Sequence, residues 1–295
     1  MAVGEIISVA RYNAMQVKIR NVLAGVGTSG QFGYGQDPIK SSPVASTNTV
    51  NATHMQNLKL DLIDAYVHQT GSIPGLTNIV TSEDITDAVY IEYENIVNLV
   101  YNNKTDIFES TQASVEAKLT SQRTTTWGGN AQPQTVSHEI TVTFGNLDQR
   151  RYFFNAGGEV RIAASLTSSS GAKYAEWNSM LAAMSTLKFN YDTTTGGSGT
   201  SPNNIGNFEL TTSYQVIWIK SGSGVYSQND VIVYAKVDSA NSGKLYFKVE
   251  FNDSASGNVD ESVAGTLTSS ITQLRPTGLY VELASPVYQT TISLA

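Results

Sequence analysis

The side chains that most often carry chemistry are scarce in this chain and do not form a known catalytic pattern. The chain has no cysteine, which excludes disulfides, thiolate metal sites and a cysteine nucleophile. Its three histidines are His54, His68 and His138, and none belongs to an H-E-x-x-H zinc motif. His54 and His68 lie about four helical turns apart, so they cannot share one metal ion. We expect all three to be surface or hydrogen-bonded structural residues.

Acidic residues and glycines offer three further candidates. The acidic residues of 83–94 lack the alternating spacing and central glycine of a calcium loop, which favours the solvated face of a helix. Asp253, Asp260 and Glu261 surround a glycine-containing turn and are a second, unsupported cation alternative. The G-x-G-x-x-G letters at 25–30 follow a predicted helix instead of a strand, so they indicate a helix end and not a nucleotide site. We therefore expect no metal and no cofactor.

Hydrolase chemistry has little support. No serine lies in a G-x-S-x-G elbow, which disfavours a histidine-based nucleophilic triad. Paired carboxylates for glycoside hydrolysis can come from distant parts of a chain, but Asp, Glu and His are sparse in the second part of this one. We expect a protein that is not an enzyme.

The most distinctive segment runs from 150 to 161 and reads RRYFFNAGGEVR. Its two glycines permit a tight corner between strands, its aromatics can pack on both sides of a thin domain, and Arg161 can pair with Glu159 on one face of a strand. An aromatic platform for a sugar or receptor is the weaker alternative to core packing. We predict a structural corner made of Phe153, Phe154, Gly157, Gly158 and Arg161.

Helices dominate the first part of the chain. Apolar spacing predicts helices at 4–24, 53–70 and 82–101. Thr53 and Gln56 have capping-box spacing, Gly71 can end the second helix, and Ser82 can cap the third. The Gly-rich segment 25–50 is either an irregular connector or an arm that docks elsewhere. Helix faces and arm together suggest a protein–protein contact, and the candidate assembly residues are Phe32, Tyr34, Leu58, Leu62 and Tyr66.

Strands dominate the rest. Residues 113–120 alternate in polarity, and Gly, Asn and Pro turns separate further candidates at 135–145, 158–167, 208–220, 230–237, 243–252, 262–273 and 278–293. A helix over 173–187 interrupts them, and 193–204 reads as a mobile loop. The prediction is an α+β protein: a helical region, 1–110, followed by an antiparallel, jelly-roll-like β-sandwich domain, 111–295.

Composition supports these exclusions. Charged residues make up 15% of the chain and the net charge is −7, which disfavours a basic nucleic-acid surface. The first residues lack the pattern of a secretory signal, and the apolar runs are too short to span a bilayer, so we expect a soluble protein that does not insert into membranes.

Several segments resemble virion structural proteins of T4-like tailed phages that infect marine cyanobacteria. The resemblance spans most of the chain through short motifs in matching order, at 4–16, 33–36, 54–58, 151–161, 177–178 and 249–253. It implies a virion component, assembled in the host cytoplasm with other virion proteins, and no catalytic residue. The particle component that it represents is left open.

Two functions follow as hypotheses. The favoured one is a non-enzymatic neck, tail or baseplate-associated component that forms a symmetric homo-oligomer through its N-terminal helices and arm. The alternative is a fibre or adhesion module that contacts a host receptor or glycan through residues such as Trp127 and Trp177. A depolymerase is the weakest hypothesis.

Overall fold

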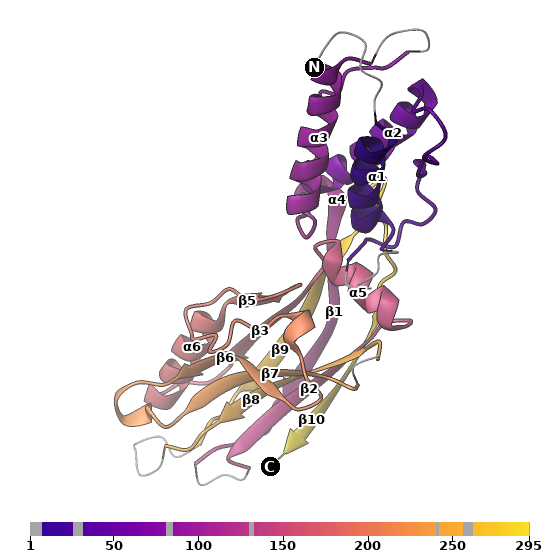
Figure 1. Ribbon diagram of the computed structural model, residues 1–295. Coiled ribbons are helices and arrows are strands. Elements are labelled where there is room, and N and C mark those ends of the chain that lie inside the picture. The colour runs from indigo at the N-terminus through magenta and orange to yellow at the C-terminus, as the bar shows by residue number, and fades with distance from the viewer. Residues whose placement is uncertain are drawn as a thin grey trace. The chain divides into compact units, whose positions relative to one another are not determined.

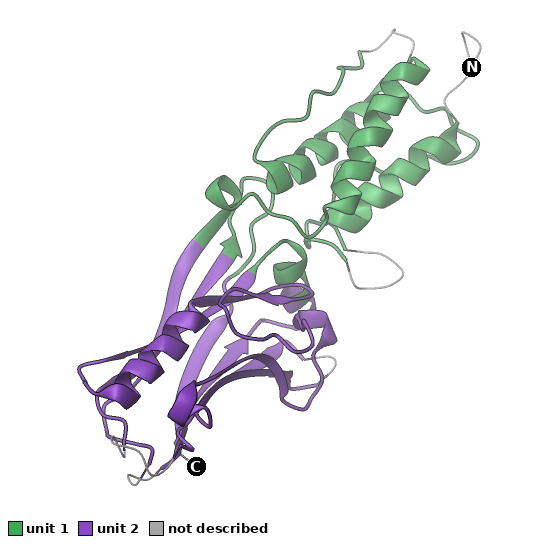
Figure 2. Cartoon of the chain, turned by 90° about the vertical axis from the view of Figure 1, so that its left-hand side faces the viewer, with its two compact units in different colours: residues 1–114, 151–158, 275–284 green, residues 115–150, 159–274, 285–295 purple. Residues whose placement is uncertain are grey.

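The computed structural model describes residues 8–25, 32–80, 85–129, 133–239, 242–255 and 262–294, and Figure 1 shows its helices and strands. The chain forms two compact units, shown in green and purple in Figure 2. The helical unit comprises 1–114, 151–158 and 275–284, and the β unit comprises 115–150, 159–274 and 285–295. A helical N-terminal region followed by a strand-rich region confirms the predicted α+β class.

The unit boundaries differ from a single division after residue 110. Two short later segments, 151–158 and 275–284, belong to the helical unit, so the chain passes between the units five times. In the first of these segments, the Ala156 carbonyl accepts a hydrogen bond of 3.0 Å from His68 Nε2. Asn155 donates to the Gly33 carbonyl at 3.1 Å. Because of these long-range contacts, 151–158 belongs to the helical unit, although a division of the chain at residue 110 assigns this segment to the sandwich.

Three long helices build the core of the helical unit. They are α1 (Val9–Leu23), α2 (Ala52–Thr70) and α3 (Asp87–Asn102), and the short α4 (Glu109–Gln112) follows. Each long helix buries one apolar face, and in α2 it is the face that the spacing predicted. In α1 the spacing of Ala10, Ala14 and Val17 predicts the buried side wrongly: these residues are exposed, and Met15 and Ile19 are buried instead. The fully buried side chains include Tyr12, Ile19, Met55, Leu58, Leu62, Tyr93 and Val100.

The caps of the helices agree with the sequence-based predictions at some helix ends and differ from them at others. Gly71 ends α2 with a φ of 71°, as predicted. The capping box of α2 is not Thr53–Gln56: Asn51 accepts from the His54 amide at 3.1 Å, and His54 Nδ1 accepts from the Asn51 amide. The described part of α3 has Thr86 as its N-cap, and Ser82 lies outside the described residues.

The described part of the Gly-rich segment, 32–50, lies on the helices of its own unit. Asp61 on α2 accepts from the amides of Lys40 and Ser41, at 2.9 and 2.7 Å. Asn13 on α1 donates to the Val44 carbonyl and accepts from the Val44 amide, both at 2.9 Å. The segment is therefore a hydrogen-bonded connector across α1 and α2.

A helix that sequence patterns did not predict, α5 (Leu147–Asn155), precedes the glycine corner. Phe153 and Phe154 on it are fully buried, with ring centroids 5.2 Å apart. Gly157 has a φ of 79°, and an added Cβ would lie 2.6 Å from Ile107 Cγ2. The corner is real, but it joins a helix to a strand and not two strands.

The β unit consists of two five-stranded antiparallel sheets, ordered β1-β9-β3-β4-β5 and β10-β2-β8-β7-β6. The first contains β1 (Ala113–Arg123), β9 (Thr266–Pro276), β3 (Glu159–Thr167), β4 (Thr186–Phe189) and β5 (Thr194–Thr195). The second contains β10 (Val287–Leu294), β2 (Thr135–Thr143), β8 (Lys244–Asn252), β7 (Asp230–Val237) and β6 (Gln215–Ser221). Short 3-10 turns occupy Asn207–Glu209 and Gly224–Tyr226.

The two sheets pack face to face, which confirms the predicted sandwich. Phe189 of one sheet meets Phe247 of the other, with ring centroids 5.0 Å apart. The pairings of β1 with β9 and of β2 with β8 resemble the wound strand pairs of a jelly roll, whereas β6, β7 and β8 form a meander. The predicted helix over 173–187 is α6 (Ala172–Met184), which buries Trp177 and Met180.

Three departures from the predicted strand pattern are the largest. The strand expected from 208 begins at Gln215, and the one expected from 278 begins at Val287. The expected mobile loop, 193–204, contains β5 and is hydrogen-bonded to β6 through Thr200 and Ile219, whose amides and carbonyls exchange two bonds of 2.8 Å. These backbone hydrogen bonds explain why the polar segment 193–204 is held against a strand.

Candidate functional site

The residues predicted to make the assembly interface are mostly internal. Tyr34, Leu58 and Leu62 are at most 1% exposed. The Tyr34 hydroxyl accepts from Gln69 Nε2 at 3.0 Å. Tyr66 and Phe32 are half-buried, and the Lys104 ammonium lies 4.9 Å from the centre of the Phe32 ring. Tyr34, Leu58 and Leu62 thus belong to the core of the helical unit, whereas part of Phe32 and of Tyr66 remains accessible.

The histidines are hydrogen-bonded, as predicted. His68 and His138 are fully buried, and burial lowers the pKa of each imidazole to about 4. The nearby Arg123 charge adds to the decrease at His138, whose Nδ1 lies 2.8 Å from Ser269 Oγ. Both rings are neutral near pH 7, and each joins elements of its own unit.

A buried ion pair lies in the β unit and was not predicted. Lys173 Nζ on α6 is 2.7 Å from Asp253 Oδ2, with side-chain exposures of 1% and 0%. The other oxygen of Asp253 accepts from Trp177 Nε1 at 3.3 Å. Trp127 packs edge-on against Trp177, with ring centroids 4.8 Å apart. Both Asp253 oxygens are thus engaged by this chain, which leaves the cation alternative without support here.

Three further residues from the predicted sites remain to be placed: Asp260, Glu261 and Arg161. Asp260 and Glu261 lie outside the described residues. Arg161 Nε donates to Glu159 Oε2 at 2.6 Å, which confirms the predicted pair. Within the described residues, no group of three or more His, Asp or Glu side chains is arranged to hold a metal ion. In that same part of the chain, no helix is long and apolar enough to cross a membrane.

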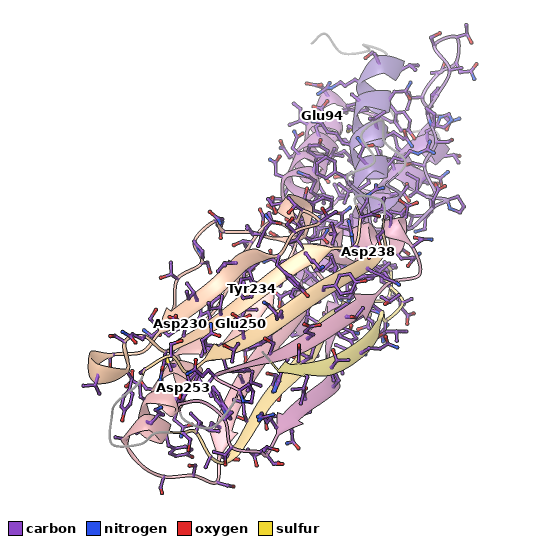
Figure 3. The ribbon with its side chains drawn as sticks, turned by 90° about the horizontal axis from the view of Figure 1, so that it is seen from below. Glu94, Asp230, Tyr234, Asp238, Glu250 and Asp253 are labelled. Carbon is purple, nitrogen blue, oxygen red and sulfur yellow. The ribbon has the colours of Figure 1, made fainter. Side chains whose placement is uncertain are left out.

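Tyrosines and lysines cover the outer face of the second sheet, which sequence patterns also missed. Figure 3 shows this face, with Tyr234 and Glu250 labelled on β7 and β8. The Lys248 ammonium lies 4.4 Å from the centre of the Tyr234 ring, and Lys236 lies 4.6 Å from that of Tyr214. Lys248 also pairs with Glu250 at 2.6 Å. The ammonium groups occupy ring faces that a sugar would need for stacking.

The strongest candidate for a binding surface is the outer face of α1 and α3, which we call the α1–α3 face. Its exposed residues are apolar, small or amides: Ala10, Ala14, Val17, Ala88, Ile91, Asn95, Asn98, Leu99 and Asn102. Val17 is 52% exposed, Ile91 44% and Leu99 41%. Such a surface suits protein contact, because covering these uncharged residues removes apolar area from water.

The charged side chains between α1 and α3 form ion pairs and hydrogen bonds with one another. Arg11 on α1 donates to Glu94 and Asp87 on α3, both at 2.6 Å. Its hydrogen bonds lower the pKa of Glu94, so the carboxylate stays ionised. Lys18 donates to Asn98 at 2.7 Å. A surface hollow of about 280 Å³ lies between these groups, lined also by Ala14, Met15 and Val97.

Comparison with known protein-family models, curated proteins and solved structures finds no significant match to this chain.

Proposed function

We propose that this chain is a non-enzymatic structural component of a tailed-phage particle that assembles through its helical unit. The motif resemblance supports the virion role, and a neck, tail or baseplate-associated position is the part of the proposal that concerns its place in the particle. The observation that carries the assembly role is the α1–α3 face, where Val17, Ile91 and Leu99 are exposed in a setting of small side chains and amides. The connector 32–50 hydrogen-bonds to both α1 and α2, which helps to fix the position of α1.

The virion role is tested by finding the chain in particles. We expect quantitative mass spectrometry of purified particles, from the phage that encodes the chain, to detect it in fixed stoichiometry, and cryo-EM to place it there as a symmetric oligomer. Its absence from purified particles would overturn the proposal.

The role of the α1–α3 face is tested by introducing negatively charged side chains into it. We expect Val17→Asp together with Ile91→Asp to reduce incorporation into particles by at least about tenfold, because a partner would have to bury two unpaired carboxylates. Leu279→Asp is the matched control, since Leu279 is 83% exposed and lies in the same unit but outside this face. Circular dichroism must show that both variants are folded. Wild-type incorporation of the double variant would rule this face out.

A receptor- or glycan-binding role has weaker support. Trp127 and Trp177, the aromatics suggested for it, are 1% and 0% exposed. Loss of binding on their replacement would therefore report loss of folding. The half-buried tyrosines on the outer face of the second sheet have lysines over their rings.

A further inference from the structure

Among the strands that the structure describes, four lie at sheet edges, and three of these carry features that hinder pairing with another chain. The edge β1 carries Glu116, Lys118 and Arg123. The edge β5 has only two residues. The edge β6 has a register shift between Val216 and Trp218, and Thr200 already pairs with its Ile219. Each of these features discourages addition of a further strand.

The fourth edge, β10, has none of these features. Its eight residues, VYQTTISL, include no charge and no proline. It pairs with β2 without a register shift, from Val287 opposite Thr143 to Leu294 opposite Val136. In the described part of the chain, β2 is its only strand neighbour, and Figure 3 shows β10 in yellow at the rim of the sheet. Val287 is 61% exposed and Ile292 39%.

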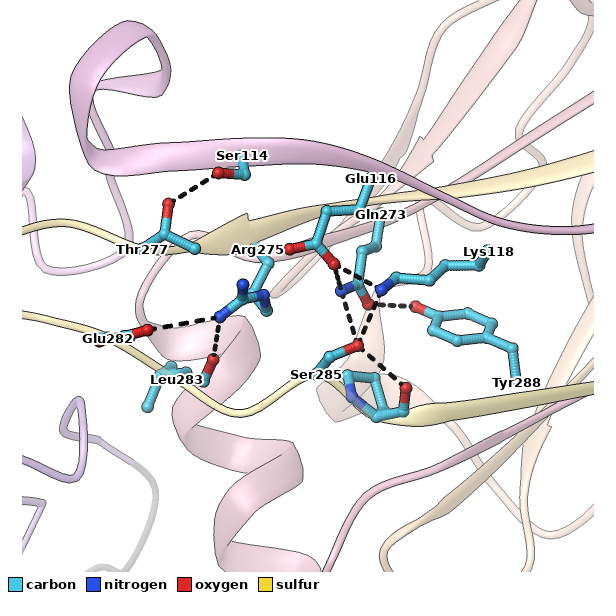
Figure 4. A network of polar contacts seen from close by, with 11 residues as sticks. Ser114, Glu116, Lys118, Gln273, Arg275, Thr277, Glu282, Leu283, Ser285 and Tyr288 are labelled. Atoms are coloured by element: carbon cyan, nitrogen blue, oxygen red, sulfur yellow. Dashed lines mark hydrogen bonds and ion pairs between the residues drawn. The ribbon is translucent and has the colours of Figure 1, made fainter.

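The start of β10 is held by a polar network (Figure 4). The Tyr288 hydroxyl donates to Gln273 Oε1 on β9 at 2.9 Å. Gln273 Nε2 donates to Glu116 on β1 at 2.7 Å and to Ser285 Oγ at 3.0 Å. Lys118 Nζ also donates to Ser285 Oγ, at 2.9 Å. Because β10 is tied to both sheets, its open edge is preorganised and needs little further ordering when a strand is added.

We propose that β10 pairs antiparallel with β10 of a second copy of this chain, so that two five-stranded sheets become continuous. A strand-adding partner must bring backbone N–H and C=O groups that are free to pair, and a second copy of this chain offers them along the open edge of its own β10. The chain carries a net charge of −7, but none of it lies on β10, so two copies can approach here without like charges facing each other. The pairing goes beyond the proposed function, because it requires neither a particle nor the α1–α3 face.

Symmetry restricts the register of this pair. A two-fold axis perpendicular to the sheet places the inner faces of both copies on the same side of the joined sheet. In that arrangement, even-numbered residues face even-numbered residues, and odd-numbered residues face odd-numbered ones. The register centred on Thr290 satisfies this condition and places a threonine opposite a threonine and an aromatic ring opposite a β-branched side chain, both favourable cross-strand pairs. Its pairs are Thr290 with Thr290, Gln289 with Thr291, Tyr288 with Ile292, and Val287 with Ser293.

The association is measured by sedimentation of the full chain over a range of concentrations. We expect a reversible dimer, and we expect Gln289→Lys with Thr291→Lys to weaken it by at least about tenfold, because lysines then face lysines. Both positions are exposed, so the fold should persist, which thermal unfolding checks. Thr120→Lys with Gln122→Lys places the same charges on the exposed face of β1 and should leave the dimer intact. A wild-type chain that stays monomeric, or a lysine variant that dimerises normally, would overturn the pairing.

A second pair of substitutions tests the register. Gln289→Glu with Thr291→Lys changes the same two positions, but each glutamate then faces a lysine of the other copy. We expect this variant to dimerise at least as well as wild type, with an affinity that falls as salt rises. In addition, Thr290→Cys should give a dimer-linking disulfide, in a chain that has no other cysteine. Loss of the dimer in the Glu/Lys variant would reject this register. Normal incorporation of the lysine variant into particles would leave the virion role intact.

Discussion

Lys173 and Asp253, which are 80 residues apart in the chain, form an ion pair of 2.7 Å from which water is almost completely excluded. The pair joins α6 to the segment that follows β8. Trp177, on the same helix as Lys173, donates to the second carboxylate oxygen of Asp253 at 3.3 Å. Each of these buried charges is stabilised mainly by the other, because water cannot solvate the remaining charge once its partner is removed.

Replacing one member of this pair should be costly. We expect Lys173→Met to lower the free energy of unfolding by about 3–5 kcal/mol, because it leaves a buried carboxylate without its cation. Adding Asp253→Asn should recover a large part of the loss, since the amide oxygen can still accept from Trp177. Lys40→Met is the control: Lys40 pairs with Asp64 but is 44% exposed, and about 1 kcal/mol or less should be lost. Urea unfolding measures all three, and equal losses for Lys173→Met and Lys40→Met would contradict the expectation.

Acid should destabilise the fold through its buried histidines. The folded-state pKa of His138 is lowered to about 4, whereas an unfolded histidine titrates near 6.5. The unfolded chain therefore binds a proton that the folded chain does not, so stability is complete above about pH 6.5 and decreases toward pH 4, by about 3 kcal/mol. His68 has the same shift and adds a second contribution.

The contribution of His138 can be isolated by comparing pH slopes. We expect His138→Asn to lose less unfolding free energy than wild type between pH 7 and pH 4.5 in urea titrations, whatever its stability at pH 7. The carboxylates titrate in both proteins and cancel in the difference. Parallel pH profiles would show that the imidazole is not held neutral.

The N-cap of α2 gives a prediction that separates two neighbouring residues. Asn51 accepts from the amide of His54, so Asn51→Ala should cost about 1 kcal/mol of unfolding free energy. Thr53 is exposed within the first turn, and Thr53→Ala should change stability by less than about 0.5 kcal/mol. Denaturant unfolding of the two variants decides between them, and the reverse order would restore Thr53 as the cap.

Local periodicity was enough to predict the elements whose burial follows a single face. Met55, Leu58 and Leu62 recur at helical spacing, and they are the buried residues of α2. In β7 and β8, burial alternates strictly along the strand, so a pattern of period two identified both. In α5, by contrast, three successive aromatics resemble a strand, and the helix was missed.

Long-range partners could not be predicted from spacing. His138 meets Ser269 across 131 residues, and Lys173 meets Asp253 across 80. No local signal encodes either distance, because the strand order creates them. The same holds for the edge position of β10, and for the burial of Tyr34 against Gln69, which turned a candidate contact residue into an internal one.

The discontinuous make-up of the helical unit has a consequence during translation. Its three long helices are complete once residue 102 has been synthesised, but the carbonyl that pairs with His68 belongs to Ala156, and the last stretch of the unit ends at residue 284. At ribosomal speeds of about 5–20 residues per second, these helices wait on the order of ten seconds or more for their final neighbours. The chain up to residue 284 must therefore leave the ribosome before the helical unit can be finished.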